Sequence, residues 1–177
     1  MNTFIALLRG INVGGHKKVP MADLRELLTK SGFKNVKTYI QSGNVIFQSL
    51  QEDKEKLEVS IKKSILDHFG FEVSVMVRFR DDLESAFNNC PFPKKKKVNS
   101  YFAILSVIPN EDLVKEACKK TYENEEYVIL NDCLYFYCAN GYGNAKFNLN
   151  FFERKLNVSA TSRNYKTMVK LLSLSDI

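Results

Sequence analysis

The spacing of apolar residues changes several times within the first 80 residues, and this succession constrains the fold more than any other feature of the chain. Segments with the composition or alternation of β-strands lie at residues 3–8, 36–40, 45–48 and 71–79. Segments with apolar residues at helical spacing lie between them, at residues 21–28 and 57–69. The last strand alternates as a half-buried strand does. The predicted order of elements is βαββαβ.

This order predicts a ferredoxin-like unit, in which an antiparallel sheet carries two helices on one face. A helix connects the first two strands, so these strands run parallel and end at the same edge of the sheet. The third strand returns from the turn at residues 41–44 and lies beside the first. We therefore expect the loop that follows residue 8 to lie close to that turn.

The pattern restarts after a segment with two prolines and four lysines. Strand-like segments lie at residues 101–107, 127–130, 133–137 and 157–161. Helices are expected from Asn110 and at about residues 145–156, and Ser162 is expected to cap a closing helix. The sequence thus predicts an α+β fold with two ferredoxin-like (βαββαβ) units, antiparallel sheets and a C-terminal helix. The predicted boundaries are 1–80 for the first unit, 81–98 for a linker region and 99–177 for the second unit with the C-terminal helix.

Length and composition narrow the class of protein. The chain has 177 residues, of which 45% are hydrophobic, and can therefore build a substantial core without disulfides. It contains no apolar run of about 18 residues, and its first residues lack the basic region of a signal peptide. The sequence predicts a cytoplasmic protein with no membrane partner.

The cysteines and histidines do not form a metal-binding pattern. No C-x-x-C pair occurs among Cys90, Cys118, Cys133 and Cys138, and only His16 and His68 accompany them. We expect reduced thiols, no metal site and no bound cofactor. Because Cys133 and Cys138 are an odd number of positions apart on a predicted strand, they should point to opposite faces.

The formal net charge of +6 favours an anionic partner. The basic residues fall into three zones, which are Arg9 with Lys17 and Lys18, the run at residues 94–97, and a C-terminal group of Lys146, Arg154, Lys155, Arg163, Lys166 and Lys170. An anionic small molecule or nucleotide is the expected partner, and a nucleic acid is a further candidate. The run at residues 94–97 is equally compatible with a solvated linker.

The loop after the first strand combines glycines with basic residues. Successive backbone N–H groups of such a loop can hold an anion, and Arg9 directly after a buried strand requires a partner or a ligand. The loop is not a P-loop, because His16 occupies the lysine position and no Ser or Thr follows. The alternative is that its glycines only allow the chain to turn.

Two further loops offer polar groups. Gln41-Ser42-Gly43-Asn44 could bind a base, a sugar or a carboxamide, or could simply form a turn. Gly141–Lys146 and Thr161–Asn164 each precede a predicted helix, and together they predict an electropositive pocket, with capping and solvated cations as the alternative. The predicted ligand-binding residues are Arg9, Asn12, Lys17, Lys18, Gln41, Ser42, Asn44, Lys146, Arg163 and Asn164.

Four sequence words cover most of the chain: A-L-L-R-G-I-N-V-G-G at 6–15, K-V-P-M-A-D-L-R at 18–25, T-Y-I-Q-S-G-N-V-I-F at 38–47 and A-T-S-R-N-Y-K-T at 160–167. They resemble the bacterial family known as domain of unknown function 1697. The resemblance implies paired ferredoxin-like units in a bacterial cytoplasmic protein, and it supplies no catalytic roles. Tyr165 stands where a tryptophan is usual in that family.

Three classes of function are compatible with these observations. The first is binding of a phosphate-bearing or other anionic small ligand, such as a nucleotide, at the basic glycine-rich loops. The second is a small-molecule enzyme that uses His16 or a cysteine, although no acid/base pair, triad or metal cluster is visible. The third is a module that binds RNA or a protein partner without catalysis; Phe4, Tyr39 and Phe47 are too scattered for an RNA-recognition signature.

Overall fold

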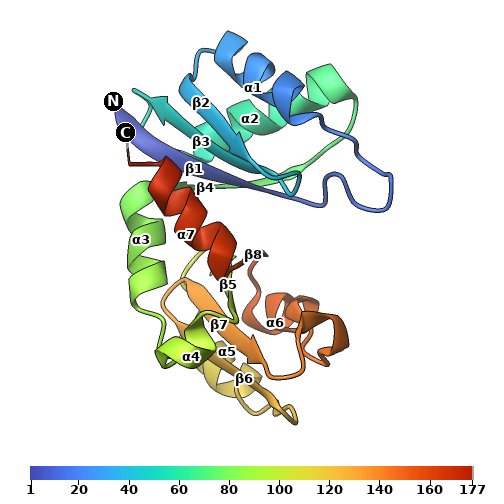
Figure 1. Cartoon of the computed structure of the whole chain (residues 1–177), viewed down its shortest axis with the longest axis vertical. Coiled ribbons are helices and arrows are strands. Elements are labelled where there is room, and N and C mark those ends of the chain that lie inside the picture. Colours follow the sequence, from blue (N-terminus) through green and yellow to red (C-terminus); the bar gives the residue numbers. More distant parts are fainter. Residues whose placement is uncertain (177) are drawn as a thin grey trace. The chain divides into compact units, whose positions relative to one another are not determined.

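The computed structural model describes residues 1–176 and contains two four-stranded antiparallel sheets (Figure 1). The first sheet has the order β2-β3-β1-β4 and the second the order β6-β7-β5-β8. The elements of the first half are β1 (Asn2–Arg9), α1 (Met21–Lys30), β2 (Lys34–Tyr39), β3 (Asn44–Ser49), α2 (Lys54–Phe69) and β4 (Ser74–Phe79). The elements of the second half are β5 (Ser100–Leu105), α5 (Glu111–Ala117), β6 (Glu125–Leu130), β7 (Cys133–Cys138), the 3₁₀ turn η1 (Tyr142–Asn144), α6 (Leu149–Leu156) and β8 (Ala160–Asn164). The predicted α+β fold with two βαββαβ units is confirmed.

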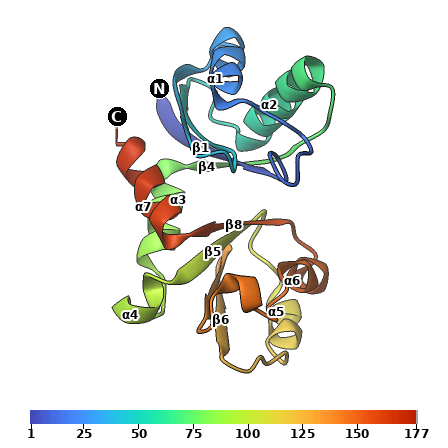
Figure 2. The same ribbon diagram turned by 45° about the vertical axis from the view of Figure 1, so that its right-hand side comes forward.

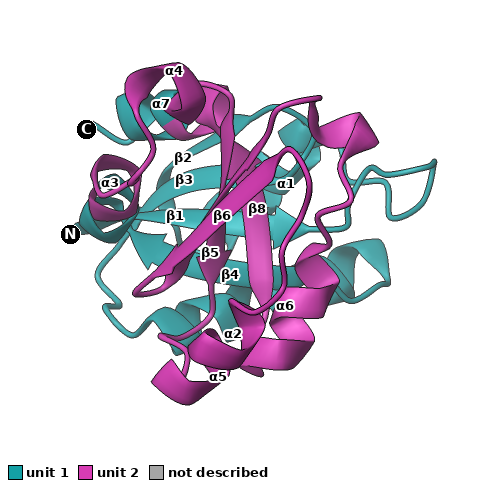
Figure 3. Ribbon diagram, turned by 90° about the horizontal axis from the view of Figure 1, so that it is seen from below, with its two compact units in different colours: residues 1–84, 169–177 teal, residues 85–168 magenta. Residues whose placement is uncertain are grey.

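Three more helices connect or follow the two halves: α3 (Arg80–Asn88), α4 (Lys94–Lys97) and α7 (Tyr165–Leu174). The chain forms two compact units, the first from Met1–Glu84 with residues 169–176 and the second from Ser85–Met168 (Figure 3). The end of α7 therefore belongs to the first unit, whereas the sequence pattern places it with the second. Its last residues contact the first unit, since the Lys37 ammonium lies 3.4 Å from the Leu174 carbonyl. The region predicted as a linker, 81–98, contains α4 and most of α3.

In the first unit, α1 and α2 cover one face of the sheet (Figure 1). The alternate residues of β1 that point to these helices are fully buried, as are Leu24 and Leu28 of α1 and Ile61 of α2. The helices end where the sequence predicts: Gly70 terminates α2 with a φ of 79°, a conformation that a Cβ disfavours. Asp53 caps the start of α2 through bonds to the N–H groups of residues 55 and 56.

In the second unit, α5 and α6 lie side by side on one face of the sheet (Figure 2). Their core is aromatic, because Phe147 stacks between Phe136 and Phe152 with ring centroids 4.2 and 5.0 Å away. Cys138 belongs to this core, whereas Cys133 points to the opposite face of β7, as its spacing predicts.

The two units repeat one local arrangement. The N–H of Leu8 at the end of β1 donates to the carbonyl of Gly43 in the following hairpin, at 2.7 Å. The N–H of Leu105 at the end of β5 donates to the carbonyl of Asp132 in the corresponding hairpin, at 2.8 Å. In each unit the end of the central strand is therefore fixed to the neighbouring turn.

Three local predictions were wrong. The last strand was predicted at residues 157–161, whereas β8 begins at Ala160 and pairs with β5 as far as Asn164. Asn157, with a φ of 53°, ends α6 in the left-handed conformation and so cannot begin the strand. Ser162 lies within this strand and cannot cap α7, a role that Asn164 takes through a 2.9 Å bond from the Thr167 N–H. Residues 71–79 were expected to form a half-buried strand, yet Arg78 on the other face of β4 is also buried.

Candidate functional site

The first predicted constellation is the loop after β1 together with the hairpin between β2 and β3, and the structure brings the two together. The Asn12 side chain joins them: its Oδ1 accepts from the Val19 N–H at 2.8 Å, and its Nδ2 donates to the carbonyls of Val19 at 3.0 Å and Gln41 at 2.9 Å. A φ of 55° at Asn12 suits an asparagine. We call residues 9–19 and 40–44 the clasp, because Asn12 holds loop and hairpin closed.

The hairpin side of the clasp is equally well satisfied. Asn44 is fully buried, and its Nδ2 donates to the Tyr39 carbonyl and to the Ser42 hydroxyl, both at 3.0 Å. Gly43 packs so closely on the loop that a Cβ placed there would lie 2.6 Å from the Cβ of Leu8 and 2.9 Å from Cδ1 of Ile11. The amides of the clasp therefore bond to the chain itself.

The basic residues of the clasp differ in their exposure to solvent and in their contacts. Arg9 is half-buried at the end of β1, opposite Ser74 of β4. The Lys17 ammonium donates to the Glu72 carbonyl at 2.7 Å and so ties the loop to the segment before β4. Lys18 and His16 are exposed. Ligand binding by these residues stays a prediction.

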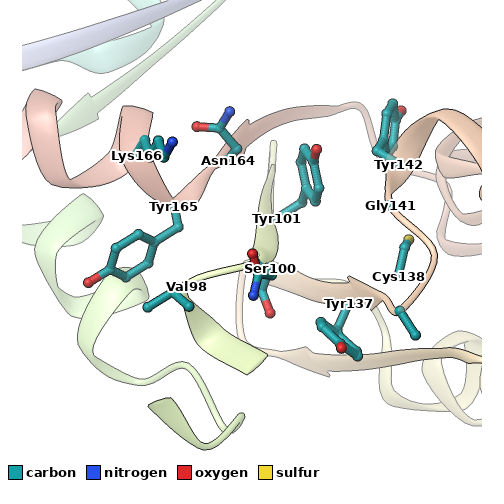
Figure 4. A pocket seen from close by; sticks show the side chains of 12 residues that line it. Val98, Ser100, Tyr101, Tyr137, Cys138, Gly141, Tyr142, Asn164, Tyr165 and Lys166 are labelled. Carbon is teal, nitrogen blue, oxygen red and sulfur yellow. The ribbon is translucent and has the colours of Figure 1, made fainter. Parts of the chain in front are cut away.

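The second constellation lies at one end of the second sheet. Because β5 runs antiparallel to both β7 and β8, its first residues, Ser100 and Tyr101, lie beside the last residues of those strands, Cys138 and Asn164. The segments that continue from these ends surround a cavity of about 420 Å³ (Figure 4). It is lined by Val98, Asn99, Ser100, Tyr101, Tyr137, Cys138, Ala139, Gly141, Tyr142, Asn164, Tyr165 and Lys166. We call it the tyrosine cavity.

Aromatic rings form much of its wall. Tyr101 packs on Tyr142 with centroids 4.8 Å apart and on Phe136 at 5.0 Å, and the Phe136 and Tyr142 centroids are 5.9 Å apart, so the three rings form one cluster. Figure 4 shows Tyr101 between Tyr142 and Asn164. Tyr142 is half exposed on the turn η1 and presents an aromatic surface at the rim. A planar ring can stack on such a surface.

Two side chains of the tyrosine cavity, Asn164 and Lys166, carry donors that have no partner among the described residues. Asn164 uses its Oδ1 to cap α7, and no described residue pairs with its Nδ2. Lys166 is exposed in the first turn of α7 and forms no ion pair with any residue in the described part of the chain. The lining contains no carboxylate. The first N–H groups of a ten-residue helix add a positive dipole end. This arrangement suits an anion next to a planar group.

The approach of the two predicted loops is thus observed, but two of the predicted cations do not take part. Lys146 is exposed outside the lining, and its N–H bonds to the Glu125 carboxylate. Arg163 lies within β8 with its side chain on the opposite face, 8% exposed, and donates to the Thr161 hydroxyl at 2.9 Å. Burial lowers the pKa of Arg163 to about 10. Asn164 is the one predicted residue that lines the cavity.

Sequence reasoning missed Tyr101, Tyr142 and Lys166 as lining residues. Tyr101 was assigned only to a strand, and its position at the strand end became meaningful once the pairing with Asn164 was known. Tyr142 lies inside the predicted segment Gly141–Lys146, and Lys166 lies two residues beyond Asn164, so attention to the aromatic residue of the first segment and to the start of the helix after the second could have found them.

None of the four cysteine thiols has the lowered pKa that is typical of a nucleophile. Burial raises the pKa of Cys138 to about 11, and burial also raises the pKa of Cys90, Cys118 and Cys133. A thiol with a raised pKa stays protonated at neutral pH and reacts slowly. In residues 1–176, no three His, Cys, Asp or Glu side chains come together to hold a metal ion.

A cavity of the first unit has a different character. It measures about 460 Å³ and is lined by Met1, Asn2, Thr3, Phe79, Arg80, Asp81, Ser175 and Asp176. Arg80 contributes a guanidinium group to the lining of this cavity. That group pairs with the Glu84 carboxylate at 2.8 Å and with the Asp81 carboxylate at 3.5 Å. Its cation is neutralised within the chain, whereas Lys166 of the tyrosine cavity pairs with no carboxylate of a described residue.

Comparisons with known proteins support the fold and the family. The family model described as "Protein of unknown function (DUF1697)" matches residues 1–135. A solved structure of a conserved bacterial protein from Streptococcus pneumoniae is similar over 99% of both chains, with 26% sequence identity and a TM-score of 0.79. No curated protein matches the chain. No helix among the described residues is long and apolar enough to cross a membrane.

Proposed function

We propose that this chain, which belongs to the family described as "Protein of unknown function (DUF1697)", binds a small ligand in the tyrosine cavity. The proposed ligand carries a phosphate and resembles a nucleotide. The observation that carries the proposal is the combination of a wall of packed tyrosine rings with an unpaired lysine, an amide donor and no carboxylate. A base would stack on the exposed face of Tyr142, and a phosphate would lie near Lys166 and the start of α7.

The dimensions of the cavity support a small ligand. Its volume of about 420 Å³ lies within the range of about 300–1,000 Å³ that small-molecule sites occupy. The four cysteines are free thiols, which is typical of proteins from a reducing compartment. A cytoplasmic location, where nucleotides are available, is part of the same proposal.

The enzyme alternative has less support. The His16 side chain is exposed in the clasp, and the backbone N–H of His16 donates to the Val13 carbonyl at 3.0 Å. The raised pKa of each cysteine thiol argues against a thiolate nucleophile. No histidine or carboxylate is among the residues that line the tyrosine cavity, so its lining lacks the usual pair of acid and base for hydrolysis or group transfer. Binding without a named reaction is therefore the function proposed.

Calorimetric titration of the full chain with UMP, AMP, uridine and inorganic phosphate tests the proposal. We expect the nucleotides to bind more tightly than uridine or phosphate, because only they engage both the aromatic wall and the cation. Tyr142→Ala should weaken nucleotide binding by about 5- to 150-fold, the value of one stacking contact, and Tyr142→Phe should retain most of it.

Lys166→Gln should weaken binding of the nucleotides several-fold and leave the weak binding of uridine unchanged. Lys63→Gln is the matched control, because Lys63 is an exposed lysine on α2 of the first unit. Nucleotide binding that survives both Tyr142→Ala and Lys166→Gln unchanged would place the site elsewhere and overturn the proposal.

A further inference from the structure

The four lysines of α4 directly precede the residues that line the tyrosine cavity. Val98, which follows Lys97, is the first lining residue along the chain and lies below Tyr165 in Figure 4. The helix rises about 1.5 Å per residue, so Lys94 lies roughly 6 Å of helix from Val98. A lysine side chain spans that distance with ease.

Two of these lysines are fixed to aromatic rings that belong to the cavity or support it. The Lys96 ammonium lies 5.5 Å from the ring centroid of Tyr137, a lining residue, and also pairs with Glu126. The Lys97 ammonium lies 4.2 Å from the ring centroid of Phe87, which packs on Tyr165 at 5.4 Å. Lys96 and Lys97 therefore anchor α4 beside the cavity.

The other two lysines have no such role. Lys94 and Lys95 are exposed, and neither side chain makes an ion pair with a described residue. Like charges three positions apart, as at Lys94 and Lys97, and cations in a first turn both destabilise a helix, so the lysines weaken α4. Lys166 is the one cationic side chain among the residues that line the tyrosine cavity. The exposed ammonium groups of Lys94 and Lys95 could therefore bind further negative charges of a ligand that extends out of the cavity.

Resting on the proposed function, we infer that the ligand is a single-stranded nucleic acid, with one base in the tyrosine cavity and the following phosphates on Lys94 and Lys95. Stacking on tyrosine and charge along the backbone are how proteins bind single strands without reading their sequence. The sheet face that RNA-recognition domains use, opposite the helices, offers no exposed surface along β1 in the first unit, since Ile5, Leu7 and Ile46 on that face are buried.

Fluorescence anisotropy of the full chain with labelled octamers of oligouridine and oligothymidine tests this inference, with UMP as competitor. We expect both octamers to bind at least tenfold more tightly than UMP. The ratio of the Kd values of the two octamers measures any preference for RNA over DNA. Between about 50 and 400 mM salt, the double variant K94Q/K95Q should reduce the slope of log Kd against log salt by about 1.4, because each phosphate contact to a single strand contributes about 0.7. K62Q/K63Q, an adjacent pair on α2, is the control with the same change in charge.

The outcomes separate the two proposals. Octamers that bind no more tightly than UMP, or a salt slope that K94Q/K95Q leaves unchanged, would overturn the inference while nucleotide binding stands. Failure of both UMP and the octamers to bind would overturn the proposed function as well. Polyphosphate that binds as tightly as the octamers, or octamer binding that is unaffected by Tyr142→Ala, would also overturn the inference, because the cavity would then hold no base.

Discussion

In the first unit, the polar side chains at the ends of β1 and β2 bond to the chain itself, whereas in the second unit those beside Tyr101 face a cavity. Asn12 uses both its oxygen and its amide group to close the clasp. Asn164 uses only its oxygen, to cap α7, and keeps its donor beside the cavity. The same type of side chain thus serves structure in one unit and is available to a ligand in the other.

The difference shows that a glycine-rich polar loop does not by itself indicate a site. A loop can bind a ligand if its hydrogen-bonding groups lack partners within the chain. An amide that already has its hydrogen bonds gains little free energy from bonding to a ligand. Substitutions in the clasp should therefore change the free energy of unfolding, and substitutions in the cavity should change affinity. The predictions below test that division, beginning with the largest effect.

Gly43→Ala should destabilise the protein by about 3 kcal/mol, because the added Cβ meets Leu8 and Ile11 and the φ of 82° is unfavourable for alanine. Urea unfolding measures the change. Gly10→Ala is the control: its φ is 74°, but nothing lies within 4 Å of the added Cβ, so it should cost only about 1 kcal/mol. Equal costs would show that the close approach of loop and hairpin is unimportant.

Asn12→Ala should lower the free energy of unfolding by about 2–3 kcal/mol, since the Val19 N–H and the carbonyls of Val19 and Gln41 lose their partner. The same variant should bind UMP with unchanged affinity, measured by calorimetry. A loss of UMP affinity with little change in stability would make Asn12 a ligand-binding residue, as the sequence predicts.

Stability should also fall at alkaline pH through Cys138. Its folded pKa of about 11 lies above the ordinary value of 9.0, so the unfolded chain loses the proton first as the pH rises. The contribution is constant below about pH 9, and about 2 kcal/mol is lost between about pH 9 and 11. Unfolding of Cys138→Ala across this range should show a shallower decline than the unsubstituted chain, and an identical slope would contradict the burial of this thiol.

Lys166→Gln should have the smallest effect on stability. A lysine in the first turn of α7 opposes the helix dipole, so its removal should leave the free energy of unfolding unchanged or raise it by a few tenths of a kcal/mol. Thermal unfolding measures the change. A clear loss of stability would mean that Lys166 supports the fold, and its effect on nucleotide affinity would then have a structural cause.

Most of the fold could be predicted because its elements have clear apolar periodicity and their ends carry glycine, proline or a capping residue. The clasp could be predicted because parallel strands end at the same edge of a sheet. The tyrosine cavity was located only in part. Five residues form β8, and pairing with β5 fixes where it begins and ends. With that register Arg163 points to the opposite face, and Asn164 and Lys166 take the place that the sequence assigned to Arg163 and Lys146.

Titration of the ¹⁵N-labelled chain with UMP, followed by two-dimensional NMR, compares the two regions in a single measurement. Binding in the tyrosine cavity predicts the largest shift changes at Tyr101, Tyr142 and residues 164–166, with the clasp unchanged. The largest changes at residues 9–19 and 40–44, with the cavity residues unchanged, would show that the clasp is the ligand site.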